Sequence, residues 1–201
     1  MSNKNENNLA DQSLVEKVLS GNTNAFKTIM KNTEGLVVQI IFKMIPNSED
    51  RKDIAQDVFF KSFQKLGSFK FQSKLSTWIG QIAYNTCLNY LEKKKLILLD
   101  NDKDDNEYEQ VEIINNKIGA FTNETENRIF RKELSEILKI EIDNLSPLYK
   151  TLITLYHNEE LSYLEIAEIT GLPEGTVKNY LFRARKTLRD NLSLNYKKET
   201  L

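Results

Sequence analysis

The chain has 201 residues, of which 40% are hydrophobic and 28% charged, so it can form a packed core in one ordinary domain or two small ones. A single cysteine, Cys87, excludes a disulfide within the chain and favours a reducing compartment. The sequence has neither a signal peptide nor an apolar run of membrane-spanning length, so we expect a cytoplasmic protein without direct membrane insertion.

Apolar residues recur at helical spacing along most of the chain, whereas alternating strand-like patterns are absent. Gly21 ends the first predicted helix, and Pro46 separates the second from the third. The predicted helices cover residues 9–20, 24–44, 49–66 and 75–95, then 129–143, 147–157, 162–169 and 174–192. We therefore predict an all-α fold with two small helical domains joined by a flexible acidic linker. Its parts are a disordered N-terminal arm (1–8), a first domain (9–95), the linker (96–128), a second domain (129–195) and a C-terminal tail (196–201).

The third predicted helix is amphipathic with one exception. Its core side is expected to hold Ala55, Val58, Phe59, Phe63 and Leu66. Its polar side holds Asp53, Gln56, Asp57, Phe60 and Lys61. Phe60 would be an exposed aromatic among polar groups, which indicates a surface for a macromolecular partner. The alternative is that this helix is buried more widely than its pattern indicates.

A short basic loop leads into the fourth predicted helix, which ends in three lysines, Lys93 to Lys95. Polar and aromatic groups of this segment suit unpaired bases, which can stack on rings and be read along their edges. The candidate residues are Lys70, Lys74, Ser76, Gln81, Tyr84, Asn85 and Leu88. We assign Trp78 to the core, with a stacking platform for a base as the alternative, and the three lysines could instead complement the negative end of a helix.

The middle of the chain is acidic. Residues 1–95 carry 14 Lys or Arg and 9 Asp or Glu, whereas residues 96–130 carry 3 and 9. This acidic segment is too polar to bury, so we predict a tether between domains. A transient role as a mimic of nucleic acid is the alternative. The acidic segment offsets the positive charge of the first half, so the net charge of −1 does not exclude a nucleic-acid partner.

Residues 161–188 have the pattern of a helix-turn-helix. Ser162 and Glu165 form a capping box at the start of a short helix, in which Leu164, Ala167 and Ile169 are expected to make the apolar contacts. Gly171 suits the left-handed residue that ends this helix, and Pro173 falls where the next helix begins.

The second helix of this motif separates apolar from basic residues. Its buried stripe is predicted to be Val177, Tyr180, Leu181, Ala184 and Leu188. From Val177 to Arg189 there are five basic residues and no acidic one. A DNA-reading helix needs one packed side and one side that offers cations and amides to the major groove. The candidate residues are Thr176, Lys178, Asn179, Phe182, Arg183, Arg185 and Lys186. The alternative is a solvated basic face on an ordinary helix.

Together these motifs resemble one known family. The segments Asp-Ile-Ala-Gln-Asp-Val-Phe (53–59), Ser-Thr-Trp-Ile (76–79) and Ile-Ala-Tyr-Asn (82–85), followed by the helix-turn-helix, are similar to bacterial RNA polymerase sigma factors of the sigma-70 family. The short length with two helical domains resembles the extracytoplasmic-function group. The resemblance covers about residues 9–95 and 129–192.

The resemblance implies a role for each surface. Asp53, Gln56, Asp57, Phe60 and Lys61 match the helix that docks on the clamp coiled coil of core RNA polymerase. The loop at residues 70–76 and the helix face with Gln81, Tyr84, Asn85 and Leu88 match the surface that opens the −10 promoter element. The basic face from Thr176 to Lys186 matches the helix that reads the −35 element. Promoter DNA and an anti-sigma factor are the further partners that the family implies.

Two departures from the family pattern affect the −10 surface. The chain reads Lys70-Phe71-Gln72 where the family often has a glycine-bearing loop, and Asn89 where an aspartate is common. These changes leave the −10 sequence preference open.

Two other classes of function fit the sequence less well. A stand-alone helix-turn-helix regulator would use the C-terminal half but leave Phe60 and the surface from Trp78 to Asn85 without a role. An enzyme is disfavoured, because the only histidine, His157, and the only cysteine, Cys87, fall on different predicted domains. No metal-ligand spacing, phosphate-binding glycine loop or nucleophile elbow is present, so we expect neither a metal nor a cofactor.

Overall fold

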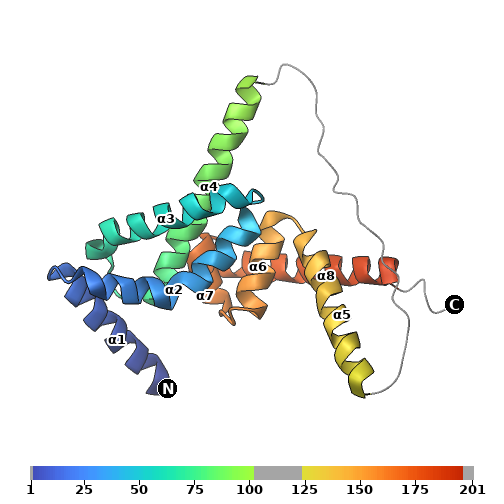
Figure 1. Cartoon of the computed structure of the whole chain (residues 1–201), viewed down its shortest axis with the longest axis horizontal. Helices are drawn as coiled ribbons and strands as arrows, with labels where there is room; N and C mark the ends of the chain where they lie inside the picture. Colours follow the sequence, from blue (N-terminus) through green and yellow to red (C-terminus); the bar gives the residue numbers. More distant parts are fainter. Residues whose placement is uncertain (1, 102–123, 197–201) are drawn as a thin grey trace.

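The computed structural model describes the backbone of residues 2–101 and 124–196 and the side chains of residues 9–95 and 134–194. Within these ranges the chain forms helices and no strand, which confirms the all-α prediction (Figure 1). The elements are α1 (Ser2–Leu19), α2 (Thr23–Met44), α3 (Ser48–Lys65), the 3₁₀ turn η1 (Leu66–Ser68), α4 (Leu75–Asn101), α5 (Glu124–Asp143), α6 (Pro147–His157), α7 (Tyr163–Thr170) and α8 (Glu174–Tyr196). Along these described helices, no stretch combines the length and the apolar character needed to cross a membrane.

Three helices extend further than their apolar patterns. The backbone of α1 is helical from Ser2, α4 continues to Asn101, and α5 already begins at Glu124. The added residues are mostly polar in α1 and α5, whereas in α4 they begin with the apolar run at 96–99. Once a helix is nucleated by packed residues, neighbours of moderate helix propensity can prolong it. The central part of the predicted linker, residues 102–123, and the tail from residue 197 lie outside the described residues.

Helix α2 lies at the centre of the N-terminal half and contacts α1, α3 and α4. Its start is fixed by Asn22, whose side chain accepts a hydrogen bond from the Asn24 amide, and α3 is capped in the same way by Asn47. Apolar residues of α2 are buried along almost its whole length, from Ala25 to Met44. The N-terminal half is therefore a four-helix unit built around one helix.

The core side of α3 differs from the predicted one. Its buried residues are Ile54, Val58 and Ser62, whereas Phe63 is 42% exposed and packs edge-on against Phe26 with ring centroids 5.1 Å apart. The Ser62 hydroxyl donates a hydrogen bond of 2.7 Å to the Val58 carbonyl, so this small polar group can be buried. The prediction of Phe63 as a core residue was wrong. It chose large apolar side chains, whereas the buried side of α3 follows the four-residue spacing of Ile54, Val58 and Ser62.

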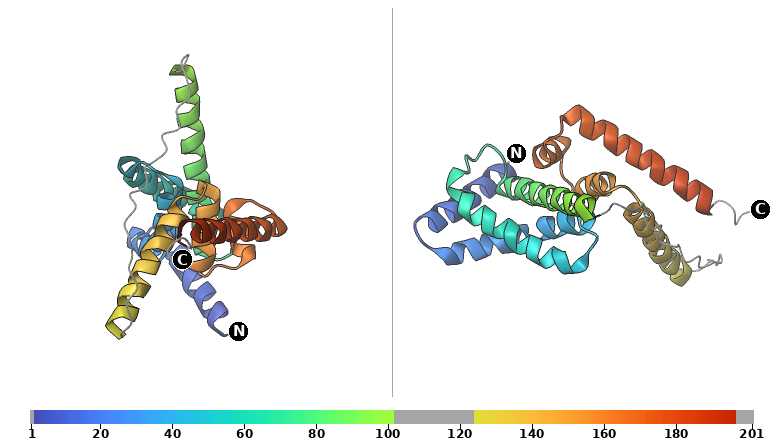
Figure 2. Two further views of the ribbon diagram at one scale, coloured as in Figure 1. Left: turned by 90° about the vertical axis from the view of Figure 1, so that its right-hand side faces the viewer. Right: turned by 90° about the horizontal axis from the view of Figure 1, so that it is seen from above.

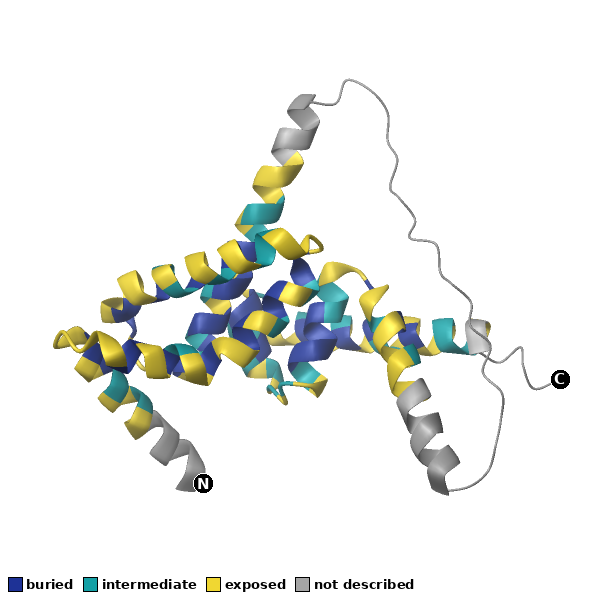
Figure 3. Ribbon diagram, viewed as in Figure 1, coloured by how far each residue is buried: buried dark blue, intermediate teal, exposed yellow. Residues whose placement is uncertain are grey.

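The two halves of the chain pack directly against each other. Helix α6 contacts α2, and α7 contacts α4, as the views in Figures 1 and 2 show. At the edge of this interface the Lys43 ammonium forms an ion pair with Asp143 at 2.6 Å. Buried residues form one continuous apolar cluster through both halves (Figure 3). The sequence predicted a tether between the halves but not this interface.

The turn that ends α7 provides a stability test. Gly171 adopts φ +70° at the C-terminus of α7, and an added Cβ would meet no atom within 4 Å, so any penalty comes from the backbone conformation. We expect Gly171→Ala to lower the free energy of unfolding by about 1–2 kcal/mol in urea titrations. Gly175→Ala is the matched control, because Gly175 lies in the first turn of α8 and has equal space. An equal loss in both variants would contradict this explanation.

Candidate nucleic-acid and polymerase interfaces

The helix-turn-helix is formed by α7 and α8 with the predicted local geometry. The Ser162 amide donates to the Glu165 carboxylate at 2.9 Å, and the Glu165 amide donates to the Ser162 hydroxyl at 3.3 Å, which completes the capping box. Gly171 is left-handed at the end of α7, and the Pro173 carbonyl accepts hydrogen bonds from the amides of Thr176 and Val177. These contacts fix the angle at which α8 leaves the turn.

Helix α8 has the predicted division into a packed and an exposed side. Val177, Leu181, Ala184 and Leu188 are buried, and Tyr180 is half-buried against them. On the other side Phe182 is 65% exposed. The exposed polar residues around it are Lys178, Asn179, Arg183 and Lys186. An aromatic ring among cations and amides can contact both an apolar base edge and the sugar-phosphate backbone.

One residue of α7 was misassigned. Leu164 is 58% exposed, whereas Ile166 is buried and supplies the apolar contact that was expected from Leu164. The two residues differ by about 200° around a helix, so they lie on nearly opposite sides and only one of them can face the core. Leu164 instead adds an apolar side chain to the exposed surface of the helix-turn-helix.

Arg185 is half-buried, unlike the exposed basic residues of α8. Its Nε donates to His157 Nε2 at 3.4 Å, and its guanidinium lies 4.9 Å from the centre of the Tyr156 ring. Tyr156 stacks on Tyr163 with centroids 5.0 Å apart, and Lys178 lies 5.4 Å from the Tyr163 ring. This cluster joins α6, α7 and α8 beside the basic face. Sequence reasoning did not find it, because its members are far apart in the chain.

The face of α3 that was predicted to contact a partner is exposed to solvent. Asp53, Gln56 and Asp57 are exposed, and Phe60 is 61% exposed, so the wide-burial alternative for this helix is excluded. Lys61 is half-buried and pairs with Asp57 at 2.6 Å. Helix α3 thus presents carboxylates and one ring on a single face.

A shallow pocket of about 290 Å³ separates this face from α4 and includes Asp50, Asp53, Asp57 and Lys61. The Tyr90 hydroxyl of α4 donates a hydrogen bond to Asp50, and Lys94 pairs with the same carboxylate at 3.5 Å. These contacts tie the start of α3 to the far part of α4. They were not predicted, because nothing in the local pattern links residues 40 positions apart.

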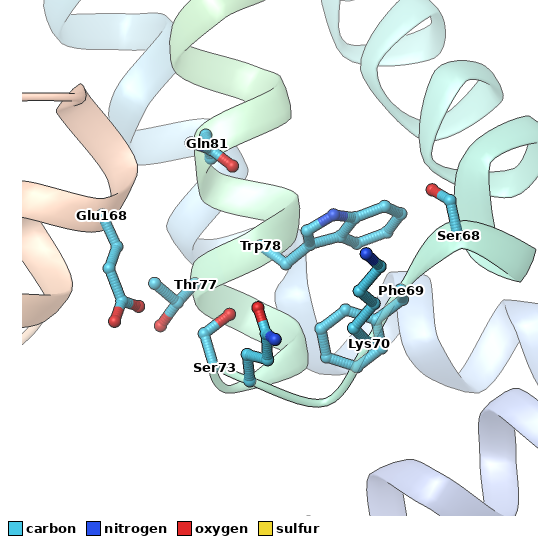
Figure 4. Close-up of a pocket in the computed structure, with 9 residues that line it drawn as sticks. Ser68, Phe69, Lys70, Ser73, Thr77, Trp78, Gln81 and Glu168 are labelled. Carbon is cyan, nitrogen blue, oxygen red and sulfur yellow. The ribbon is translucent and has the colours of Figure 1, made fainter.

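The loop before α4 and the start of α4 line a second pocket, of about 350 Å³ (Figure 4). Lys70 and Trp78 line it, and Trp78 packs on Phe69 with centroids 5.2 Å apart. Trp78 is half-buried and in contact with the core, as predicted. Of the predicted −10 candidates, Lys70, Lys74, Gln81 and Asn85 are exposed, and Ser76 and Leu88 are half-buried.

Tyr84 is the candidate that the structure removes from this surface. It is only 5% exposed, and burial raises the pKa of its phenol. Because α2, α3 and α7 all contact α4, the helix is covered on more sides than its own periodicity indicates. The placement of Tyr84 on an open DNA-facing surface was therefore wrong for this conformation.

Within the residues whose side chains are described, no group of His, Cys, Asp or Glu side chains is arranged to hold a metal ion. Cys87 is fully buried, and burial raises the pKa of its thiol to about 12. At neutral pH it is therefore a packing residue rather than a nucleophile.

An all-helical architecture in the described residues and a helix-turn-helix with an exposed basic face are features of a DNA-binding protein. Two family models match it: Sigma-70 region 2 over residues 29–97 and Sigma-70, region 4 over residues 136–188. The chain is 33% identical to the ECF RNA polymerase sigma-E factor of Haemophilus influenzae over 92% of its length and 96% of that protein. It is 34% identical to the sigma-E factor of Escherichia coli over 90% of this chain and 93% of that one.

Solved structures agree with this fold. CnrH in complex with the cytosolic domain of CnrY has a TM-score of 0.60 at 20% identity and covers 92% of this chain and 99% of that one. The sigma factor RpoE from Bartonella quintana, in complex with the anti-sigma factor NepR, has a TM-score of 0.63 at 23% identity, over 85% and 98% of the two chains. The chain belongs to the extracytoplasmic-function group of the sigma-70 family. It is a transcription initiation factor and not an enzyme.

The cluster beside the basic face gives a direct test of its geometry. Burial, with a smaller contribution from the Arg185 charge, lowers the pKa of His157. We expect Arg185→Gln to raise this pKa part of the way to its ordinary value, because the burial remains. His157 is the only histidine, so an NMR pH titration of its ring protons reads the change without ambiguity. Lys186→Gln is the control, and an equal rise there would contradict the contact.

Proposed function

We propose that this sigma factor binds core RNA polymerase through α3 and places it on promoters by reading two DNA elements. In this proposal residues 9–95 are region 2, residues 129–195 are region 4, and residues 96–128 connect them. The observation that carries the proposal is the geometry of α8. One side of this helix is packed in the core, and the opposite side exposes cations, an amide and Phe182 to solvent.

Helix α8 would enter the major groove of the −35 element. Thr176, Lys178 and Asn179 lie in its first turns, where a recognition helix meets base edges. Arg183 and Lys186 follow on the exposed face and suit phosphates, as does Arg185 once it leaves His157. Lys178 already forms an ion pair with Glu174 at 2.7 Å, which DNA phosphates would have to replace.

Helix α3 would dock on the polymerase. An aromatic ring that is exposed among carboxylates costs solvation free energy unless a partner covers it, and such rings are frequent energetic centres of interfaces. Phe60 has this position, with Asp53, Gln56 and Asp57 on the same helix. The Asp57–Lys61 ion pair would preset the Asp57 carboxylate for a basic partner residue.

Promoter opening would use the start of α4 and the loop before it. Separated bases lose pairing and stacking, and a protein offsets that loss with ring stacking and edge contacts. Lys70, Lys74, Gln81 and Asn85 are exposed there, beside the pocket lined by Trp78. On the polymerase the −10 and −35 surfaces would act as linked sites, so two weak contacts become one strong one. No covalent bond of the DNA is changed in this step.

The same proposal includes a cytoplasmic location and an anti-sigma partner. Of the solved structures with a similar fold, CnrH is in complex with the cytosolic domain of CnrY, and the sigma factor RpoE from Bartonella quintana is in complex with the anti-sigma factor NepR. Core RNA polymerase, promoter DNA and such a regulator are therefore the proposed partners of this chain.

Runoff transcription with bacterial core RNA polymerase tests the proposal. The template is a mixed library of promoter fragments, with and without the protein. Transcripts with defined starts that require the protein would support it and identify both promoter elements. Specific duplex binding by the isolated chain, with no binding to core polymerase, would favour a stand-alone helix-turn-helix regulator instead.

Two exposed aromatic rings, Phe60 and Phe182, allow the two proposed interfaces to be tested separately. We expect Phe60→Ala to weaken binding to core polymerase by about tenfold, since a buried interfacial ring commonly contributes 1–2 kcal/mol or more. Asp57→Ala should weaken it in the same direction. Phe182→Ala is the matched control, with an equally exposed ring in the other half of the chain. Core affinity measured by fluorescence anisotropy that is unchanged in both α3 variants would reject α3 as the docking helix.

Arg183 is the test residue for the −35 surface. Arg183→Ala should weaken duplex binding by the holoenzyme and lower the slope of log affinity against log salt by about 1, because one phosphate contact releases about one counterion. Lys139→Ala, which removes an exposed cation from α5 in the same half, is the control. A salt slope that stays at the wild-type value in Arg183→Ala would show that this residue does not contact a phosphate.

A further inference from the structure

The loop between η1 and α4 contains a backbone conformation that is unusual for its residue. Phe71 has φ +55°, which lies in the left-handed region. Large side chains rarely adopt this conformation, because the Cβ atom comes too close to the following carbonyl oxygen. Glycine adopts it without strain, so the phenylalanine is held here against a conformational cost.

Both ends of this loop are fixed by the surrounding helices. At its start the Phe69 amide donates a hydrogen bond of 3.1 Å to the Leu66 carbonyl, and both side chains are buried. At its end Leu75 is buried, and its amide is hydrogen-bonded to Asp11 of α1. These contacts leave few conformations to the residues between them, which is the condition under which a strained backbone persists.

The Phe71 ring is the outer member of a row of three packed rings. Trp78 packs on Phe69 with centroids 5.2 Å apart, and Phe69 packs on Phe71 with centroids 4.7 Å apart. Phe69 is only 8% exposed, whereas Phe71 is 38% exposed. The inner rings therefore hold the outer ring in place, and the remaining surface of that ring faces solvent.

Phe71 lies beside the pocket within the proposed −10 surface. Of the described residues, Phe69 and Trp78 line this pocket, as Figure 4 shows, but Phe71 does not. Lys70 and Gln72, the neighbours of Phe71 in the chain, are exposed and do line it. A ring, a cation and an amide are the groups that proteins offer to the face, the phosphate and the edge of an unpaired nucleotide.

We infer that Phe71 is a stacking platform for one unpaired base of the −10 element, outside the pocket and separate from any base that enters it. Lys70 supplies a cation for the adjacent phosphate, and Gln72 supplies an amide for the base edge. The stack on Phe71 replaces one that the base loses when the duplex opens. Because the loop and Phe69 hold the ring before DNA arrives, binding the base requires little ordering of the protein. This inference rests on the proposed −10 role of the loop and of α4.

Three substitutions at Phe71 separate the ring from the shape of the loop. Phe71→Leu keeps a large apolar side chain without a ring, Phe71→Gly keeps the left-handed conformation without strain, and Phe71→Tyr keeps the ring. The probe is a labelled promoter fragment selected by runoff transcription and rebuilt with its −10 element unpaired. Its binding to the holoenzyme is measured by fluorescence anisotropy.

We expect Phe71→Leu and Phe71→Gly to bind this probe about tenfold more weakly than the wild type, which is within the range of one stack between a base and a ring. Phe71→Tyr should bind within about twofold of the wild type. Thermal unfolding followed by circular dichroism checks that each variant is folded. Phe71→Gly relieves the strain, so it keeps the test valid if Phe71→Leu is unstable.

An abasic scan of the same probe identifies the stacked base. Single bases of the unpaired −10 element are removed in turn, and each probe is titrated with the wild type and with Phe71→Leu. Removing the base that stacks on Phe71 should weaken the wild type about tenfold but Phe71→Leu less than about twofold, because both changes remove the same contact. Removing any other base, including one bound in the pocket, should weaken both proteins equally.

The inference and the proposed function fail in different ways. The inference is overturned if Phe71→Gly binds like the wild type, because the shape of the loop would then be sufficient. It is also overturned if Phe71→Tyr loses as much as Phe71→Leu, or if every abasic probe weakens both proteins by the same factor. In these cases the wild type still initiates transcription, so the proposed function stands. If no library fragment gives transcripts that require the protein, the proposed function fails and the inference fails with it.

Discussion

The structure depends on the burial of α2 from several sides. This helix carries apolar residues along nearly all of its 22 residues, and α1, α3, α4 and α6 each cover part of it. No single neighbour could bury so wide an apolar surface, so removing it from water requires a cluster of helices. Helix α6 belongs to the other half of the chain. The same constraint that folds the N-terminal half therefore also holds the C-terminal half against it.

This joint core makes the two halves one packed unit. Within each half the packing is continuous and the helix ends are capped by side chains. Between the halves α6 packs on α2, α7 packs on α4 around Gly80, and two ion pairs, Lys43–Asp143 and Lys74–Glu165, add charged contacts. Ion pairs of this type exchange readily for other charged partners, since part of each pair remains in contact with water. A polyanion or a larger partner surface can compete for the lysines.

Some features of the proposed functional surfaces could be predicted from the local sequence pattern, and others could not. Phe60 on α3 and the exposed face of α8 were predicted, because each lies on one amphipathic helix whose opposite side is clearly apolar. Tyr84 and Phe63 were misplaced, because both lie at the border of an apolar stripe, where neighbouring helices decide burial. The Arg185–His157–Tyr156 cluster and the Asp50–Tyr90 contact join distant parts of the chain, and no spacing rule points to them.

The sequence by itself determined the helices, the capping box at Ser162, the left-handed turn at Gly171 and the family, because all of these depend on residues that are neighbours in the chain. Only the tertiary structure decided which helices meet. Ile169 would be expected in the core of its own motif, yet it packs against Gly80 in the other half. Helical periodicity reveals that a side is apolar but not which partner covers it, since the hydrophobic effect has no direction and shape complementarity selects among the available surfaces.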